Sequence, residues 1–314
     1  MLFTPATLQA MQKGFSTLFQ QSYLSDNVPI QWDKLAERID TPGTEINLYG
    51  WMAEIPQFRK WIGPRRASRL ASRTYSLKNE NYEFSYSVGR DDIKYDRLGI
   101  YNTHATRAGQ AARVIWDQVL MTAMKTGKTV KCFDGQFFYD TDHPVDPEAV
   151  GGSTFVNLRT TFDLTIDNFN TAYGAMATLK DANGEPMMVR PNILACNSKM
   201  RKKALDVLQA SLILKVVQNV AASENVAAAA ISNVLAGDCT LMVDDRIEDN
   251  VWYLHHTVFM RPFIVQVETP PTGLEMRVNP EDPHVWENNE FLFGSRATGA
   301  AGYTLPHLSV RCEV

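Results

Sequence analysis

The stretch CFDGQFFYDTDHP, residues 132–144, gathers aromatic side chains, aspartates, a histidine and a proline into thirteen positions. Three interpretations fit such a density. Asp140, Asp142 and His143 could ligate a cation, a carboxylate and the histidine could form an acid/base pair, or the stretch could be a tight turn. These thirteen residues alone leave the three alternatives open, and the flanking sequence supplies further evidence.

The segment before this stretch has the pattern of a long helix over residues 103–126. Thr103 or Asn102 can cap its start, and Gly127 stands where a C-terminal glycine is favoured. One face carries a thin stripe rich in alanine, which lets a sheet or a second helix approach closely. The stripe consists of Ala108, Ala112, Ile115, Val119 and Ala123.

The sequence pattern of residues 50–99 predicts an extended hairpin with a basic flank. In NYEFSYSVG, residues 81–89, aromatic and polar positions alternate, which predicts a half-buried strand with Tyr82, Phe84 and Tyr86 on one face. A second alternating run begins at Tyr75, and the intervening polar KNEN predicts a turn. The basic flank, residues 59–73, could grip phosphates, form a solvated face or make salt bridges to an acidic neighbour; its predicted contact residues are Arg65, Arg66, Arg69 and Arg73.

The N-terminal segment predicts a helix followed by irregular chain. Thr4 can cap the helix, Pro5 suits its first position, and Phe15, Leu18 and Phe19 recur at helical spacing. Because about 25 weakly patterned residues follow, we interpret residues 1–49 as an arm, in which those three apolar residues make contacts.

Composition favours a globular α+β protein. The 314 residues carry a net charge of -4 and are 45% hydrophobic, which argues against a dedicated nucleic-acid binder. No apolar run is long enough for a membrane helix, and the N-terminus lacks the pattern of a signal peptide, which predicts folding in the cytoplasm. The four widely spaced cysteines predict unpaired, mostly buried thiols.

No motif for catalysis, cofactor binding or metal binding meets its requirements. KTGKTV, residues 125–130, ends like a phosphate-binding loop, but Thr122 replaces the required first glycine and a helix comes before instead of after. There is no G-x-S-x-G nucleophile elbow. We therefore predict no enzyme, no cofactor and no metal; a hydrolase with an unrecognised site and a nucleic-acid binder using residues 59–73 are the alternatives.

Four stretches taken together resemble a known family. EIPQFRKWIGPR, KNENYEFSYSVGRDDIKYDRLGIY, FDGQFFYDTDHP and VWYLHHTVFMRPFIVQVE occur in the order found in the major head subunits of Mu-like tailed phages and prophages. The likeness covers nearly the whole chain. It implies the HK97-type capsid fold and self-assembly into pentamers and hexamers, which close into an icosahedral head around double-stranded DNA.

The resemblance also implies domains and partners. Residues 1–49 correspond to the N-arm, 50–100 to the E-loop that reaches across a neighbouring subunit, and 101–150 to the P-domain with its spine helix. Residues 151–268 correspond to the A-domain, and 269–314 return to the P-domain.

The implied partners are the chain itself, portal, scaffold, protease and decoration proteins, and weakly held DNA, but no membrane. The implied location is the virion, after assembly in the host bacterial cytoplasm.

With this family in view, residues 132–144 are interpreted as a structural turn. Asp134 and Gly135 reverse the chain after the spine helix, and Phe137, Phe138 and Tyr139 pin the turn to a sheet. Pro144 ends the segment, and His143 is expected to hydrogen-bond Asp140 or Asp142.

Overall fold

The computed structural model describes residues 4–52, 72–95, 99–146, 151–181, 184–209, 212–217, 227–232 and 237–314. The chain divides into two compact units. Unit 1 comprises Met1–Leu48, Ser76–Leu120 and Ile264–Gly302, and unit 2 comprises Tyr49–Tyr75, Met121–Phe263 and Tyr303–Val314. Helices occur with both parallel and antiparallel strands, which confirms the predicted α+β class. Among the described residues, no helix is long and apolar enough to cross a membrane.

The first helix, α1 (Pro5–Leu24), forms as the sequence predicts. The Thr4 hydroxyl accepts a hydrogen bond from the backbone N–H of Thr7, and the Thr7 hydroxyl accepts one from the backbone N–H of Thr4. This reciprocal pair satisfies donors that the first helical turn leaves without partners. Phe15 and Phe19 are buried, so the apolar face of the helix lies in the core of unit 1.

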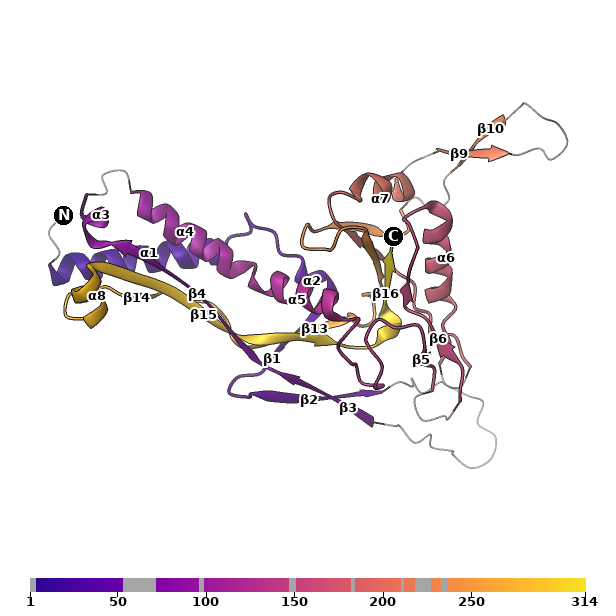
Figure 1. Ribbon diagram of the computed structural model, residues 1–314, viewed down its shortest axis with the longest axis horizontal. Coiled ribbons are helices and arrows are strands. Elements are labelled where there is room, and N and C mark those ends of the chain that lie inside the picture. The colour runs from indigo at the N-terminus through magenta and orange to yellow at the C-terminus, as the bar shows by residue number, and fades with distance from the viewer. Residues whose placement is uncertain are drawn as a thin grey trace. The chain divides into compact units, whose positions relative to one another are not determined.

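Helix α1 packs closely on α4 (Ile100–Arg113), as Figure 1 shows. Ala105, Ala108 and Ala112 of α4 are buried in the core of unit 1. A Cβ atom on Gly109 would lie 2.3 Å from the carbonyl oxygen of Phe19, so only glycine fits there. Ala108 and Ala112 of the predicted stripe thus face the core, whereas the close approach to α1 is made at Gly109, outside the stripe.

The predicted spine helix is interrupted. It begins at Ile100, after Gly99 in the left-handed region, so neither Asn102 nor Thr103 caps it. It stops at Val114, whose ψ of 9° departs from helical geometry, and resumes as α5 (Ile115–Thr126).

Polar side chains on both sides of the break hold the chain that follows α1. The Arg113 guanidinium donates to the carbonyl oxygens of Tyr23 and Val28, and the Asp117 carboxylate accepts from two backbone N–H groups.

The sheet of unit 1 has the order β1-β13-β15-β14, and β4 (Glu80–Gly89) pairs along β15 (Glu290–Tyr303) in antiparallel register. The remaining strands are β1 (Ala36–Asp40), β13 (Phe263–Thr269) and β14 (Glu275–Arg277). The alternation predicted for residues 81–89 is confirmed, because Tyr82, Phe84 and Tyr86 are half-buried while the residues between them are exposed. Short helices α2 (Trp32–Leu35), α3 (Arg90–Tyr95) and α8 (Pro283–Asn288) complete the unit.

The predicted hairpin between residues 75 and 89 was wrong in its pairing. β3 (Ser72–Lys78) pairs with β2 (Ile46–Met52), whereas β4 pairs with β15. Only Asn79 separates β3 from β4, which is too short for a hairpin turn. Asn79 is buried and anchored instead: its backbone N–H donates to Glu45, its amide donates to Thr44, and its side-chain oxygen accepts from Gln266. The chain thus passes directly from one sheet into another.

Unit 2 is built on a sheet of order β11-β8-β12-β16-β7. The strands are β7 (Leu158–Arg159), β8 (Ile193–Cys196), β11 (Thr240–Val243), β12 (Val251–His255) and β16 (Ser309–Glu313). Helices α6 (Ile166–Ala177) and α7 (Arg201–Leu208) bury Phe169, Met176 and Val207 in one core with residues of these strands. Further strand pairs are β5 (His143–Pro144) with β6 (Thr154–Phe155), and β9 (Leu212–Val217) with β10 (Ala227–Ser232); the 3-10 helix η1 (Pro306–Leu308) precedes β16.

Candidate functional site

The turn predicted at Asp134 and Gly135 is present in unit 2. Gly135 has φ of +90°, a conformation that glycine adopts without strain. Its N–H donates to the carbonyl of Cys132, and the Cys132 N–H donates to the carbonyl of Gln136. The Asp134 carboxylate accepts from the Gln136 N–H at 3.0 Å. These bonds close a compact reversal shortly after α5.

Two of the three aromatic residues assigned to this turn anchor it. Phe138 and Tyr139 are fully buried. The Phe138 ring stacks on Tyr303 at 4.4 Å, and the Tyr139 hydroxyl lies 2.8 Å from the Ser309 hydroxyl. Phe137 was assigned wrongly, because its side chain is 39% exposed.

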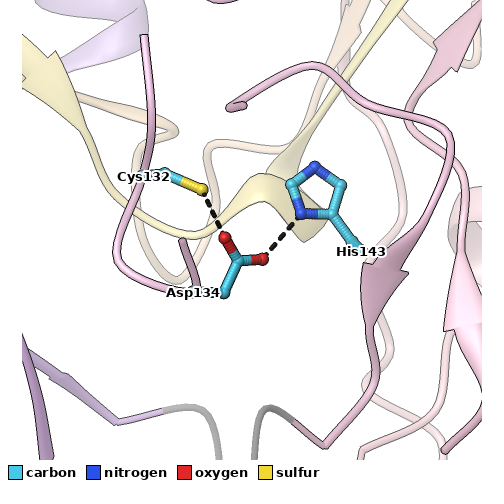
Figure 2. A group of neighbouring side chains, drawn as sticks. All are labelled: Cys132, Asp134 and His143. Carbon is cyan, nitrogen blue, oxygen red and sulfur yellow. Dashed lines mark hydrogen bonds and ion pairs between the residues drawn. The ribbon is translucent and has the colours of Figure 1, made fainter. Parts of the chain in front are cut away.

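His143 is hydrogen-bonded, but not to the predicted partners. Its Nδ1 lies 2.7 Å from Oδ2 of Asp134, whereas Asp140 and Asp142 contribute no hydrogen bond to the ring. The chain reversal explains the difference, since it returns β5 to the side of the turn. Figure 2 shows His143 and Cys132 on opposite sides of the Asp134 carboxylate. The Cys132 thiol donates to Oδ1 of Asp134 at 3.0 Å.

Burial and hydrogen bonding together set the protonation of this group. The Asp134 side chain is 2% exposed and the His143 side chain is fully buried. Burial alone would raise the pKa of Asp134, but the hydrogen bonds from His143 and Cys132 bring it below its ordinary value. Burial and the nearby Asp134 charge raise the pKa of the Cys132 thiol. The group therefore holds a carboxylate between two side chains that carry protons.

Several partners of this turn were not foreseen from the sequence. Asn157 is buried, and its amide donates to the carbonyls of Phe138 and Pro306 while its oxygen accepts from the Asp140 N–H. Phe155 stacks on His143 at 5.0 Å and on His307 at 4.1 Å. Burial, then the proximity of His143, lowers the pKa of His307 to about 3. No local pattern marks Asn157 or His307, because the fold brings them in from distant segments.

A second buried polar group secures β16. Arg311 is 3% exposed, and its guanidinium donates to the Tyr253 hydroxyl at 2.6 Å and to the Glu313 carboxylate at 2.8 Å. It also pairs with Glu248 at 2.5 Å. The Lys128 ammonium donates to Glu313 as well, which ties the segment after α5 to the same strand.

The residues predicted to contact other subunits fall into three groups. Arg65, Arg66 and Arg69 lie outside the described residues, and Arg73 lies on β3 with its side chain undescribed. Tyr82, Phe84 and Tyr86 are half-buried within their own unit, where Tyr86 stacks on Phe293 at 5.2 Å and Tyr82 packs edge-on against Trp116. Phe15 and Phe19 are buried in unit 1, so Leu18 is the member of its set with side-chain surface left. Their contacts between subunits stay a prediction.

The four cysteines are unpaired and buried, as predicted. Within the described part of the chain, one group of side chains could hold a metal ion, and it consists of Cys132, Asp134 and His143. The sequence had suggested Asp140, Asp142 and His143 as possible ligands. Of that set, His143 belongs to the observed group, whereas Asp140 and Asp142 do not.

Comparison with known proteins assigns the chain to a family. It matches the family described as "Mu-like prophage major head subunit gpT" over residues 8–161, 156–230 and 224–313. The chain belongs to the Mu-like major head subunits. This confirms the resemblance inferred from the four sequence stretches.

Curated relatives and solved structures agree with this assignment. The chain is 33% identical over 157 residues to the "Major capsid protein" of Escherichia phage Mu, a match that covers 50% of each protein. It is 30% identical over 165 residues to the "Mu-like prophage FluMu major head subunit" of Haemophilus influenzae, which covers 52% of this chain and 51% of the relative. The chain thus spans about half the length of the curated relatives it matches.

Solved structures show the fold. The chain is similar to a protein of the procapsid of bacteriophage JBD30, with a TM-score of 0.59 and 22% identity, over 99% of this chain and 76% of that one. It is also similar to the virus-like particle protein from Pyrococcus furiosus, with a TM-score of 0.53 and 11% identity, over 96% and 99% of the chains. The predicted HK97-type capsid fold is confirmed. The members found are structural capsid proteins and not enzymes.

Proposed function

We propose that this chain is the major capsid subunit of a Mu-like phage head, which self-assembles into pentamers and hexamers that close around double-stranded DNA. The observation that carries the proposal is the extent of the likeness. The family of head subunits matches from residue 8 to residue 313, and a procapsid protein shares the fold over 99% of the chain. The proposed location is the virion, after assembly in the host cytoplasm.

Exposed apolar side chains support assembly through protein contacts. Trp286 on α8 is 82% exposed, and other large apolar residues are more than half exposed in both units. Subunits of obligate assemblies bury apolar surface between chains, so these side chains are candidates for contacts with neighbouring subunits. These further residues are Leu24, Ile46, Leu48, Tyr95, Ile100, Met188 and Val258.

The paired strands β2 and β3 suggest where the E-loop lies. They form a two-stranded sheet of their own, and the residues that join them carry the basic segment 59–73. We assign the E-loop to this pair and its connection, so that it ends before β4. We assign α4 and α5 to the spine of the P-domain, residues 151–268 to the A-domain, and residues 269–314 to the return into the P-domain.

The partners follow from the same proposal. One similar structure is the capsid of bacteriophage JBD30 decorated with minor capsid protein trimers. By analogy, a decoration protein is a proposed partner of this chain. Portal, scaffold and protease are proposed on the family resemblance alone. The net charge of -4 favours weak, nonspecific contact with the packaged DNA.

Assembly of the purified chain tests the proposal. We expect analytical ultracentrifugation and negative-stain microscopy to show capsomers or shells, and a uniformly monomeric chain at all concentrations would contradict it. Retardation of DNA by the monomer, weakened by salt, would instead favour nucleic-acid binding through residues 59–73.

A quadruple charge reversal tests the proposed E-loop contacts. Replacing Arg65, Arg66, Arg69 and Arg73 by glutamate should block shell closure, because salt bridges to a neighbouring subunit become repulsive. The matched control replaces the same four residues by lysine, which keeps the charge and should still allow closure. Normal shells from the glutamate variant would remove these arginines from the contact.

A further inference from the structure

The Cys132, Asp134 and His143 side chains are the donor types that zinc takes in proteins: thiolate sulfur, carboxylate oxygen and imidazole nitrogen. One ligand atom from each lies within 4.8 Å of the other two. In a tetrahedral zinc site the ligand atoms are about 3.3–3.6 Å apart, which follows from zinc–ligand distances of about 2.0–2.3 Å. Side-chain movements of about 1 Å would therefore convert the present group into a coordination shell.

The contacts of the histidine ring orient it as a ligand. Its Nε2 lies 3.3 Å from the carbonyl oxygen of Phe138, which can only accept a hydrogen bond, so the tautomer protonated at Nε2 is the one that makes this bond. Metal-bound histidines commonly have their second nitrogen fixed in this way by a backbone carbonyl. The other nitrogen, Nδ1, then faces the Asp134 carboxylate at 2.7 Å.

The short contact between Nδ1 and Oδ2 requires a proton or a metal ion between the two atoms. An imidazole lone pair and a carboxylate oxygen both accept hydrogen bonds, so they approach to 2.7 Å only with a proton or a metal ion between them. On the other side of the carboxylate, the Cys132 Sγ lies 3.0 Å from Oδ1 and supplies a third donor. Figure 2 shows the Cys132 and His143 side chains on either side of the Asp134 carboxylate.

We propose that Cys132, Asp134 and His143 form a structural zinc site that fastens the Asp134 turn to β5. The ion takes the place of two protons, the one on the Cys132 sulfur and the one shared by Asp134 and His143, and both are released to solvent. A water molecule takes the fourth position of the tetrahedron. The proposal concerns the stability of the subunit and is independent of shell assembly.

Metal loading has to accompany folding, because the site is buried. Cys132 is 7% exposed, and the side chains of Asp134 and His143 are 2% and 0% exposed. The experiment therefore refolds the full chain with Co²⁺, a coloured substitute for zinc, and measures bound metal after gel filtration. We expect one ion per subunit and a near-ultraviolet charge-transfer band from the cobalt–thiolate bond. Refolding with Zn²⁺ should raise the thermal midpoint relative to refolding with a chelator.

Variants identify the ligands. Cys132→Ser should abolish the charge-transfer band, and His143→Gln should reduce bound metal to background. Cys239→Ser is the matched control, because Cys239 has the same exposed fraction as Cys132, lies in the same unit and should leave the band unchanged. Serine at position 132 still offers a hydroxyl donor to Asp134, so this variant should fold even where His143→Gln does not.

Two outcomes would overturn the proposal. One is wild-type chain that folds with Co²⁺ present and carries no stoichiometric metal. The other is a band that persists in Cys132→Ser and disappears in Cys239→Ser. Either result would mean that protons alone hold the three side chains together.

Discussion

The cores of the two units are stabilised in different ways. In unit 1, α1 meets α4 at Gly109, and the buried polar side chains are mostly uncharged, such as Asn79 and Gln266, with Asp117 as the buried charged group among the described residues. In unit 2, the apolar core is accompanied by buried polar groups, among them Arg311, His143 and His255. The comparison teaches that unit 1 should be sensitive to side-chain volume, whereas unit 2 should be sensitive to pH and to the loss of a single polar partner.

The largest effect is expected at the helix contact of unit 1. Gly109→Val places atoms within 2.3 Å of the Phe19 carbonyl, so α1 must move away from α4. We expect a loss of about 4 kcal/mol or more in the free energy of unfolding, since overpacking against backbone cannot relax by a rotamer change. Denaturant unfolding measures it.

Gly14→Ala is the matched control, because an added Cβ there meets nothing within 4 Å. It should stabilise the chain by about 0.5–1 kcal/mol, the gain from alanine in an exposed helix interior. Equal destabilisation by both substitutions would contradict the account of close packing at Gly109.

The second effect concerns the buried cation of unit 2. Arg311→Leu removes the partner of Glu248, Glu313 and the Tyr253 hydroxyl at a position that is 3% exposed. We expect a loss of about 3 kcal/mol, because the variant removes the cation that Glu248 pairs with, although Glu313 keeps its pair with Lys128. Thermal unfolding measures the change. Arg38→Leu removes an exposed pair with Asp40 and should cost less than about 1 kcal/mol.

The third effect is a difference between the two units in how stability depends on pH. Burial lowers the pKa of His255 from 6.5 to about 3, and within unit 2 its Nδ1 lies 3.0 Å from the Ser309 hydroxyl. Because the unfolded chain binds this proton more readily, stability is complete above pH 6.5 and falls as pH drops toward 3. The folded-to-unfolded ratio should fall by up to about tenfold per pH unit for this one group.

Hydrogen exchange resolved by residue measures this pH dependence. β12 and β16 should lose protection on acidification before α1 and α4 do, and His255→Leu should weaken that dependence. Equal loss of protection in both units at every pH would contradict the contrast between the two cores.

The smallest effect is expected at the start of α1. Thr4→Ala removes the side-chain half of the capping box and should cost about 1 kcal/mol. Thr17→Ala is the control within the same helix, since its hydroxyl only donates to the Lys13 carbonyl and the site is exposed. Circular-dichroism melts distinguish the two. Equal stability of both variants would show that the cap contributes nothing.

Local features of the fold could be predicted from the sequence. The Thr4 cap, the face of β4 and the turn at Gly135 each depend on residues within a few positions of one another, and all three are confirmed. The stripe on α4 also follows from helical spacing. Its break at Val114 could not be predicted, because valine fits the apolar pattern and the polar side chains beside the break bind distant loop backbone.

Features that depend on distant segments could not be predicted. β4 pairs with β15, which lies some 200 residues later in the chain. The prediction that β4 pairs with the neighbouring strand β3 was therefore wrong. His143 was given a partner one or three residues away, whereas its partner Asp134 lies nine residues earlier across the reversal. The role of Cys132 was missed for the same reason, since nothing in the spacing of cysteines suggests a group with one aspartate and one histidine.

Electron cryo-microscopy of particles formed by the purified full-length chain, with and without its own scaffold protein, tests the central claim most directly. We expect closed shells with pentamers and hexamers, in which every subunit contains the two units described here. Protein that stays uniformly monomeric under both conditions and forms neither capsomers nor shells would contradict the assignment as a capsid subunit.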